Sequence, residues 1–165
     1  MELGLRPLEK EDWIDVAGIY REGIETGNAT FQKEIPSWEE WNSAHLKKCR
    51  IVACHENEII GWAALTPVSG RSVYSGVAEV SVYVSNKFKE QKIGTRLLET
   101  LISESEKEGI WTLQASIFRE NDASLKLHKA LGFREVGYRE KIGKMDNRWR
   151  DTITLERRSK VVGID

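Results

Sequence analysis

Hydrophobic and polar positions alternate with two different periods along the chain, and each change of period marks a new element. Segments with the alternating or short apolar pattern of strands are 3–5, 50–55, 59–65, 79–84, 111–118, 133–142 and 149–155. Segments with the spacing of amphipathic helices lie between Pro7 and Gly27, from Ser37 to about Lys48, from Ile93 to Gly109 and from Asn121 to Gly132. The order β-α-α-β-β-β-α-β-α-β-β predicts a mixed α/β or α+β sheet with helices on both faces.

Length and composition restrict the class of protein. The chain has 165 residues, of which 40% are hydrophobic and 31% charged, with only 3 Pro, and this composition excludes disorder as the main state. We expect one domain, residues 1–165, without a linker or an internal repeat. Residues Arg157 to Asp165 are expected to form a polar tail outside the fold, and Trp13 and Trp62 to lie in the core.

Charge and targeting signals exclude several functions. The 25 Lys and Arg against 26 Asp and Glu give a net charge of −1, which argues against a general nucleic-acid binder but leaves local charge open. Neither an apolar leader region nor an apolar run of about 20 residues is present, so we expect a cytoplasmic protein that does not enter a membrane. Cys49 and Cys54 are expected to be reduced core residues, and the His residues lack the spacing of metal ligands, so no metal is expected.

The polar loop after strand 79–84 is the first candidate for chemistry. It carries Lys87, Lys89 and Lys92 and leads into Gly94 at the start of the third helix. Unpaired N–H groups at a helix N-terminus, together with nearby lysines, favour an anion. The motifs GxxxxGK[ST] and GxGxxG are both absent, and an ordinary solvated loop with lysines remains the alternative.

Two ionisable side chains are the other candidates. Glu79 stands at the head of an apolar strand, where partial burial would raise the pKa of its carboxyl and let it accept a proton from an amine. The alternative is a solvated glutamate at a strand end. His128 shares a helix face with Ser124, and its alternative is a structural histidine whose hydrogen bonds are satisfied.

These signals occur together in an order that resembles the GNAT superfamily of acetyl-CoA-dependent N-acetyltransferases. The carrying residues are Val80–Val84, the loop Gln91-Lys92-Ile93-Gly94-Thr95-Arg96, Asn121, and Leu131-Gly132-Phe133. A closer similarity is to the phosphinothricin acetyltransferase subgroup. It rests on Ile19-Tyr20, Glu25–Phe31, Glu79 before Ser81–Val84, Ala123-Ser124 with Leu127-His128, and Arg148-Trp149 with Asp151. The resemblance covers about residues 3–156 and implies the GNAT fold with a mostly antiparallel sheet.

The resemblance also implies a binding site for acetyl-CoA as co-substrate. The backbone of Val82, Tyr83 and Val84 would pair with the pantetheine arm like an added strand. The backbone amides of the following loop would hold the pyrophosphate at the helix N-terminus; they belong to Glu90, Gln91, Lys92, Ile93, Gly94 and Thr95. Asn121 and Ser124 would contact the cofactor toward its thioester end.

For the reaction, the resemblance implies direct attack of an amine on the thioester. Glu79 would act as the general base, directly or through a water, and His128 would protonate the departing thiolate. A strand N–H near Val82 would stabilise the oxyanion. The acceptor pocket would be formed by Phe31, Arg71, Tyr74, Arg148 and Trp149. The implied acceptor is a small amino-acid-like amine, phosphinothricin or methionine sulfoximine, and a homodimer is expected.

Three departures from the subgroup pattern keep other functions open. Arg96 replaces a small residue of the loop, Ser75 stands where the subgroup has an arginine, and an aromatic residue before Arg148 is missing. Arg71 is the candidate to replace the arginine absent at Ser75. The alternatives are a polyamine, a peptide N-terminus or a lysine as acceptor, or a non-catalytic acyl-CoA-binding module.

Overall fold

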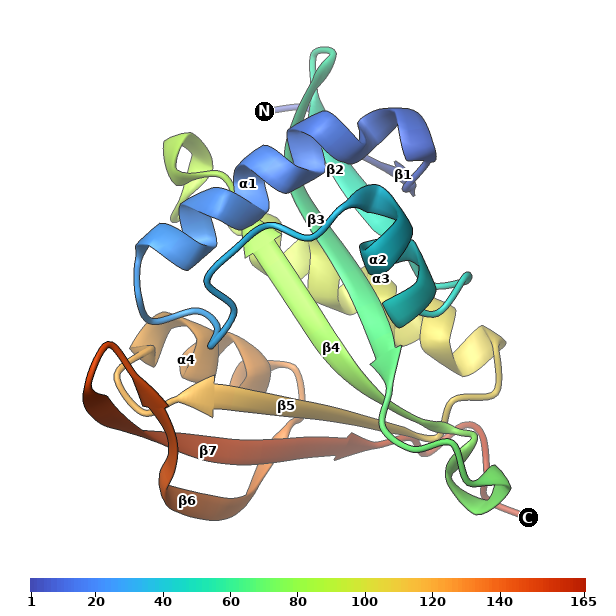
Figure 1. Cartoon of the computed structure of the whole chain (residues 1–165). Coiled ribbons are helices and arrows are strands. Elements are labelled where there is room, and N and C mark those ends of the chain that lie inside the picture. Colours follow the sequence, from blue (N-terminus) through green and yellow to red (C-terminus); the bar gives the residue numbers. More distant parts are fainter.

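A computed structural model describes all residues, 1–165, and contains one seven-stranded sheet in the order β1-β2-β3-β4-β5-β7-β6 (Figure 1). The strands are β1 (Gly4–Pro7), β2 (Ile51–His55), β3 (Glu58–Pro67), β4 (Val77–Val84), β5 (Thr112–Phe118), β6 (Arg134–Met145) and β7 (Arg148–Arg158). The α-helices are α1 (Trp13–Glu25), α2 (Trp38–Ala44), α3 (Ile93–Lys107) and α4 (Asp122–Ala130). The predicted mixed α/β architecture is confirmed.

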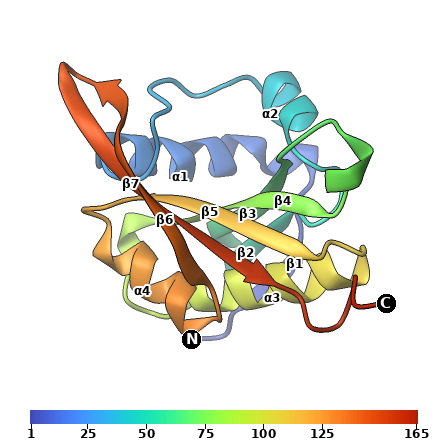
Figure 2. The ribbon, with the colours of Figure 1, turned by 90° about the horizontal axis from the view of Figure 1, so that it is seen from below.

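The sheet separates two apolar clusters. Helices α1 and α2 cover one face and helices α3 and α4 the other (Figure 2). The larger cluster, under α3, includes Leu97, Leu101 and Leu155 and is the main core. The smaller cluster, under α1 and α2, includes the buried Trp62, whereas Trp13 is only half-buried and packs against it. Trp62 is thus a core residue as predicted, and Trp13 lies at the margin of its cluster.

The junction between β4 and β5 is the feature of the sheet that positions the site. These two strands are the only parallel neighbours, and they pair over three residues, from Val77 with Thr112 to Glu79 with Gln114. Beyond Glu79 they diverge (Figure 1). The β4 backbone from Val80 to Val84 therefore has N–H and C=O groups on that side without a neighbouring strand.

Helix α2 ends at Ala44 and not near Lys48 as the sequence pattern suggests. Ser37 caps its start by accepting the N–H of Glu40 at 3.1 Å, as predicted. Its end is fixed from outside, because the Arg50 guanidinium donates to the carbonyl oxygens of Asn42, His45 and Leu46. Carbonyls satisfied in this way do not require a further helical turn.

The expectation that residues 157–165 lie outside the fold is wrong. Arg157 and Arg158 belong to β7 and pair with Leu113 and Thr112 of β5. Ser159 is only 5% exposed, and the Arg158 guanidinium donates to carbonyl oxygens of the segment that follows it. These contacts between a side chain and the backbone hold residues 159–163 in place beside the sheet. No apolar periodicity in the sequence indicates them.

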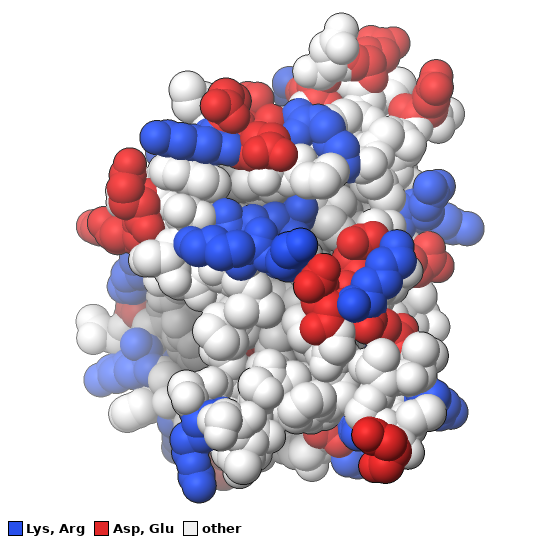
Figure 3. All heavy atoms as spheres, turned by 90° about the vertical axis from the view of Figure 1, so that its right-hand side faces the viewer, with Lys and Arg blue, Asp and Glu red and all other residues white.

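Both cysteines are reduced. Cys49 is buried, which raises the pKa of its thiol to about 11, and Cys54 is half-buried. No helix of the structure has the length and apolar character that crossing a membrane requires. On the face shown in Figure 3, basic side chains form separate groups interspersed with acidic ones, so no broad basic surface covers it.

Candidate active site

Two connected cavities lie where β4 and β5 diverge. The large cavity, of about 630 Å³, extends from the end of β4 over the start of α3 to the start of α4. The small cavity, of about 340 Å³, lies over β4, β5 and β7 and under the connection between α1 and α2. Ala29, Val82, Tyr83 and Asn121 line both cavities, so a molecule in one can meet a molecule in the other.

Most residues of the predicted anion site line the large cavity. Glu90 and Lys92 have left-handed backbones, with φ of 64° and 62°, and this tight turn leads into α3. The first N–H to bond within the helix is that of Arg96, to the Lys92 carbonyl. The N–H groups of residues 93–95 therefore have no helical partner, and Lys89 and Lys92 line the same cavity.

Contacts from other elements shape the same cavity. The carboxylate of Glu22 on α1 accepts the Asn86 N–H at 2.6 Å and so ties α1 to the loop that follows β4. Gly94 allows α3 to approach α4, because a Cβ there would lie 3.3 Å from Leu127. Arg96, which replaces a small residue of the loop pattern, is exposed and does not line the cavity. The substitution therefore leaves the cavity open.

The structure brings nearly all predicted cofactor residues to the large cavity. Those that line it are Val82, Tyr83, Val84, Glu90, Lys92, Ile93, Gly94, Thr95, Asn121 and Ser124. Gln91 is the one predicted residue that does not line it.

The small cavity is polar at its floor and aromatic at its wall. Glu79, Ser81, Ser116 and Thr152 form part of the floor, while the rings of Phe31 and Phe118 meet edge to face with centroids 4.6 Å apart. Glu79 is the only charged residue that lines the cavity. Burial raises the pKa of its carboxyl, and the positive charge of Arg139 opposes this shift. The cavity thus presents one carboxylate suited to accepting a proton.

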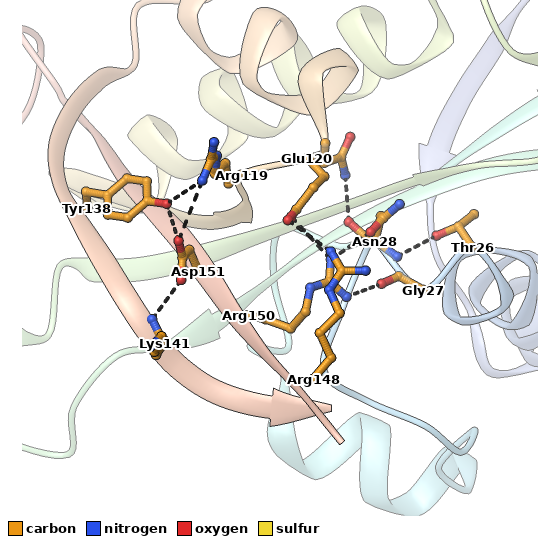
Figure 4. A network of polar contacts seen from close by, with 11 residues as sticks. Thr26, Gly27, Asn28, Arg119, Glu120, Tyr138, Lys141, Arg148, Arg150 and Asp151 are labelled. Atoms are coloured by element: carbon orange, nitrogen blue, oxygen red, sulfur yellow. Dashed lines mark hydrogen bonds and ion pairs between the residues drawn. The ribbon is translucent and has the colours of Figure 1, made fainter. Parts of the chain in front are cut away.

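A buried arginine that the sequence pattern did not single out holds the wall of this cavity in place (Figure 4). Arg150 on β7 is 4% exposed, and its guanidinium donates to the Gly27 carbonyl and the Asn28 side chain, both at 2.7 Å. It also pairs with Glu120 at 3.3 Å. Asn121 adds a hydrogen bond from its side-chain amide to the Asn28 carbonyl at 3.1 Å. These contacts anchor the connection from α1 to α2, which carries Phe31.

His128 is placed as a structural residue, in contrast to its expected role as proton donor. It is 4% exposed, packs edge-on against Phe133 and lines neither cavity. Its Nδ1 lies 2.7 Å from the Ser124 carbonyl oxygen and must donate, because a carbonyl only accepts. Burial lowers the pKa of the ring, so neutral His128 has no proton on Nε2 to give.

Four of the five predicted acceptor residues also lie outside both cavities. Arg71 lies over the exposed Tyr74 ring in the connection from β3 to β4, with the guanidinium 5.8 Å from the ring centre. Trp149 is 54% exposed, and Arg148 pairs with Glu120 at 3.3 Å. Only Phe31 lines the small cavity as expected.

Comparisons with known proteins agree with this geometry. The model of the acetyltransferase (GNAT) family matches residues 11–133. The chain is 32% identical to phosphinothricin N-acetyltransferase of Alcaligenes faecalis, over 93% of this chain and 81% of that protein. It is 24% identical to L-methionine sulfoximine/L-methionine sulfone acetyltransferase of Pseudomonas paraeruginosa, over 94% of each. A GNAT superfamily phosphinothricin acetyltransferase from Sinorhizobium meliloti, solved in complex with AcCoA, has a TM-score of 0.85 and 27% identity, covering 100% of this chain and 97% of its own.

Proposed function

Because this chain belongs to the acetyltransferase (GNAT) family, we propose that it transfers the acetyl group of acetyl-CoA to the amine of a small amino-acid-like acceptor. The observation that carries the proposal is the position of Glu79, a half-buried carboxylate at the point where a polar cavity meets the free edge of β4. Phosphinothricin and methionine sulfoximine are the first acceptors to test, since two relatives are named for them.

The residues of the large cavity fit acetyl-CoA as co-substrate. The free edge of β4 from Val82 to Val84 can pair with amide groups of a pantetheine arm as a further strand does. The unpaired N–H groups of residues 93–95 suit a pyrophosphate, and Lys89 and Lys92 add positive charge. Acetyl-CoA supplies an acetyl group activated as a thioester.

Side chains and backbone groups of this chain remove the proton, stabilise the oxyanion and assist departure of the sulfur. An amine with a pKa near 9–10 is mostly protonated at neutral pH, and Glu79 takes up its proton, directly or through a water. An N–H of β4 near Val82 is available to the developing oxyanion. On α4 the Ser124 hydroxyl lines the large cavity and can donate a hydrogen bond to the departing sulfur, in place of His128.

We also propose that the protein forms a homodimer. Strand β6 is an edge strand on which Val136, Tyr138 and Ile142 are about half exposed. An apolar edge of this kind favours a partner strand or face that covers it.

The decisive experiment follows release of free thiol from acetyl-CoA across a panel of amines. We expect turnover with phosphinothricin or methionine sulfoximine and less with polyamines, lysine and peptide N-termini. Acetyl-CoA binding in calorimetry without turnover of any amine would contradict the proposal and support a non-catalytic acyl-CoA-binding module.

Lys92→Gly should raise the KM for acetyl-CoA about three- to tenfold, because it removes a positive charge at the phosphate end of the large cavity. The free energy of unfolding should not fall, since glycine adopts a φ of 62° without steric cost. Kinetics at several salt concentrations and urea unfolding measure the two quantities.

The control is Lys87→Ala, which removes a lysine of the same loop that does not line the cavity. Its KM for acetyl-CoA should match that of the wild type. An unchanged KM in both variants would contradict the placement of the phosphates at the start of α3.

A further inference from the structure

Strand register places Arg139 on the face of the sheet that forms the small cavity. Thr152 of β7 lies between Phe118 of β5 and Arg139 of β6, as the direct cross-strand partner of each. Directly paired residues point to the same face of a sheet. Phe118 and Thr152 both line the small cavity, so Arg139 extends from the same face, one strand farther out.

The connection from α1 to α2 covers the same face. Phe31 lies so close to Gly143 of β6 that a Cβ there would be 2.6 Å from its ring, and Lys33 pairs with Asp146 beyond it at 2.6 Å. Figure 2 shows the β6–β7 hairpin rising beside this connection. Arg139 is not among the residues that line the small cavity; it lies on the same face of the sheet, one strand beyond Thr152 on the side away from β4.

Arg139 differs from the other arginines of the β6–β7 hairpin in having no ion-pair or hydrogen-bond partner. Arg134 on the same strand pairs with Glu156, and on β7 both Arg148 and Arg150 pair with Glu120. The exposed guanidinium of Arg139 forms no ion pair and donates no hydrogen bond. Its charge nevertheless acts on Glu79, where it partly opposes the rise in the pKa of the carboxyl that burial causes.

On the other face of the hairpin, by comparison, the charged and polar side chains have hydrogen-bond or ion-pair partners within the protein. There Tyr138 donates to Asp151, Arg119 contacts both, and the Lys141 N–H donates to Asp151 at 2.8 Å (Figure 4). These contacts join residues of the hairpin to one another and to Arg119 at the end of β5. On the cavity face, by contrast, the Glu79 carboxylate lines the small cavity, and the unpaired Arg139 lies on the same face one strand beyond Thr152.

We propose that Arg139 binds an anionic group of the acceptor and so makes the enzyme selective for amines that carry a negative charge. The inference rests on the proposed function and specifies its substrate class. An amino acid carries an ammonium group, which complements Glu79, and a carboxylate, which a guanidinium binds through two parallel hydrogen bonds. A polyamine has no group for Arg139 and would be repelled by it. Arg71 does not compete for this role, since it lies over the Tyr74 ring in the connection from β3 to β4 and is not a charge that acts on Glu79.

Arg139→Gln tests the proposal with amino acids that have one carboxylate, methionine sulfoximine included, and with their carboxamides. For the amino acids KM should rise about 10- to 100-fold, as expected for the loss of a charge-assisted hydrogen-bond pair, while kcat stays within about threefold. KM for the carboxamides and for acetyl-CoA should not change. Arg139→Lys should restore part of the affinity for amino acids.

Arg134→Gln is the matched control, because Arg134 is an exposed arginine of the same strand whose guanidinium is already paired with Glu156. Its kinetics should equal those of the wild type. Equal effects of Arg139→Gln on amino acids and carboxamides, or no effect on either, would overturn the inference and leave the proposed function intact. A wild-type protein that acetylates no amine would overturn both.

Discussion

Glu79→Gln should lower kcat/KM for acetyl transfer about 10²- to 10⁴-fold at neutral pH, the usual contribution of a general base. Glutamine keeps the size and polarity of the side chain but cannot take a proton from the acceptor ammonium. No other charged residue lines the small cavity, so no neighbouring carboxylate can replace Glu79. Thiol release measured with the best acceptor of the panel gives the rate, and calorimetry should show unchanged binding of acetyl-CoA.

The pH dependence follows from the same carboxyl. Burial raises the pKa of Glu79 above its ordinary value, despite the opposing charge of Arg139. Because only the ionised form accepts a proton, kcat/KM of the wild type should fall as the pH drops through this raised value. The residual activity of Glu79→Gln should lack this acidic limb.

Stability distinguishes a catalytic from a structural role of Glu79. A carboxyl with a raised pKa in the folded state binds its proton more tightly there than in the unfolded chain, so stability falls as the pH rises through that range. At neutral pH the wild type therefore carries a penalty that Glu79→Gln removes, and the variant should unfold at a higher urea concentration. A variant that loses activity and stability together would contradict a catalytic role. Glu135→Gln, a change at an exposed partner of Lys129, should alter neither property.

Local patterns were sufficient to predict the elements of the fold. The side chains of Ser37 and Asn121 cap α2 and α4 by accepting the N–H three residues later, as their positions in the sequence suggest. The end of α2 could not be predicted, because it depends on Arg50, which lies beyond the helix and donates to the carbonyl oxygens of Asn42 and Leu46. The same applies to residues 157–165, because Arg157 and Arg158 pair with β5 and the side chains of Arg158 and Ser159 bond to the backbone of the residues that follow.

In the site, too, some features could be predicted from local sequence and others depend on the tertiary structure. The turn at Lys92 and the start of α3 are local in sequence, so the motif could indicate them, and both lie at the large cavity. The positions of Arg139 and Arg150 depend on the register between β6 and β7, which shifts twice, so no local pattern reveals them. His128 was chosen by its place in a motif, but its burial against Phe133 and the Ser124 carbonyl is a tertiary property.

Arg150→Met should have the largest effect on stability, lowering the free energy of unfolding by about 2–4 kcal/mol, as hydrogen bonds to a charged group are worth about 1.5–3 kcal/mol each. The change removes the two 2.7 Å hydrogen bonds that hold Gly27 and Asn28 and leaves the half-buried Gly27 carbonyl without its arginine donor. The guanidinium also lies 4.1 Å from the centre of the Phe118 ring, and methionine cannot replace this cation–π interaction. Urea unfolding measures the loss.

The structural role of Arg150 also predicts a kinetic signature that its neighbour lacks. Loosening the connection that carries Phe31 should raise KM for the acceptor more than KM for acetyl-CoA, because most of the large cavity is built by β4, α3 and α4. Arg148→Met is the matched control: Arg148 reaches the same Glu120 at the same 3.3 Å, but its side chain is 65% exposed. An exposed pair contributes about 0–1 kcal/mol, so this variant should remain close to the wild type in both measurements. Equal losses in the two variants would mean that the ion pair with Glu120, and not the bonds to Gly27 and Asn28, holds the wall of the small cavity.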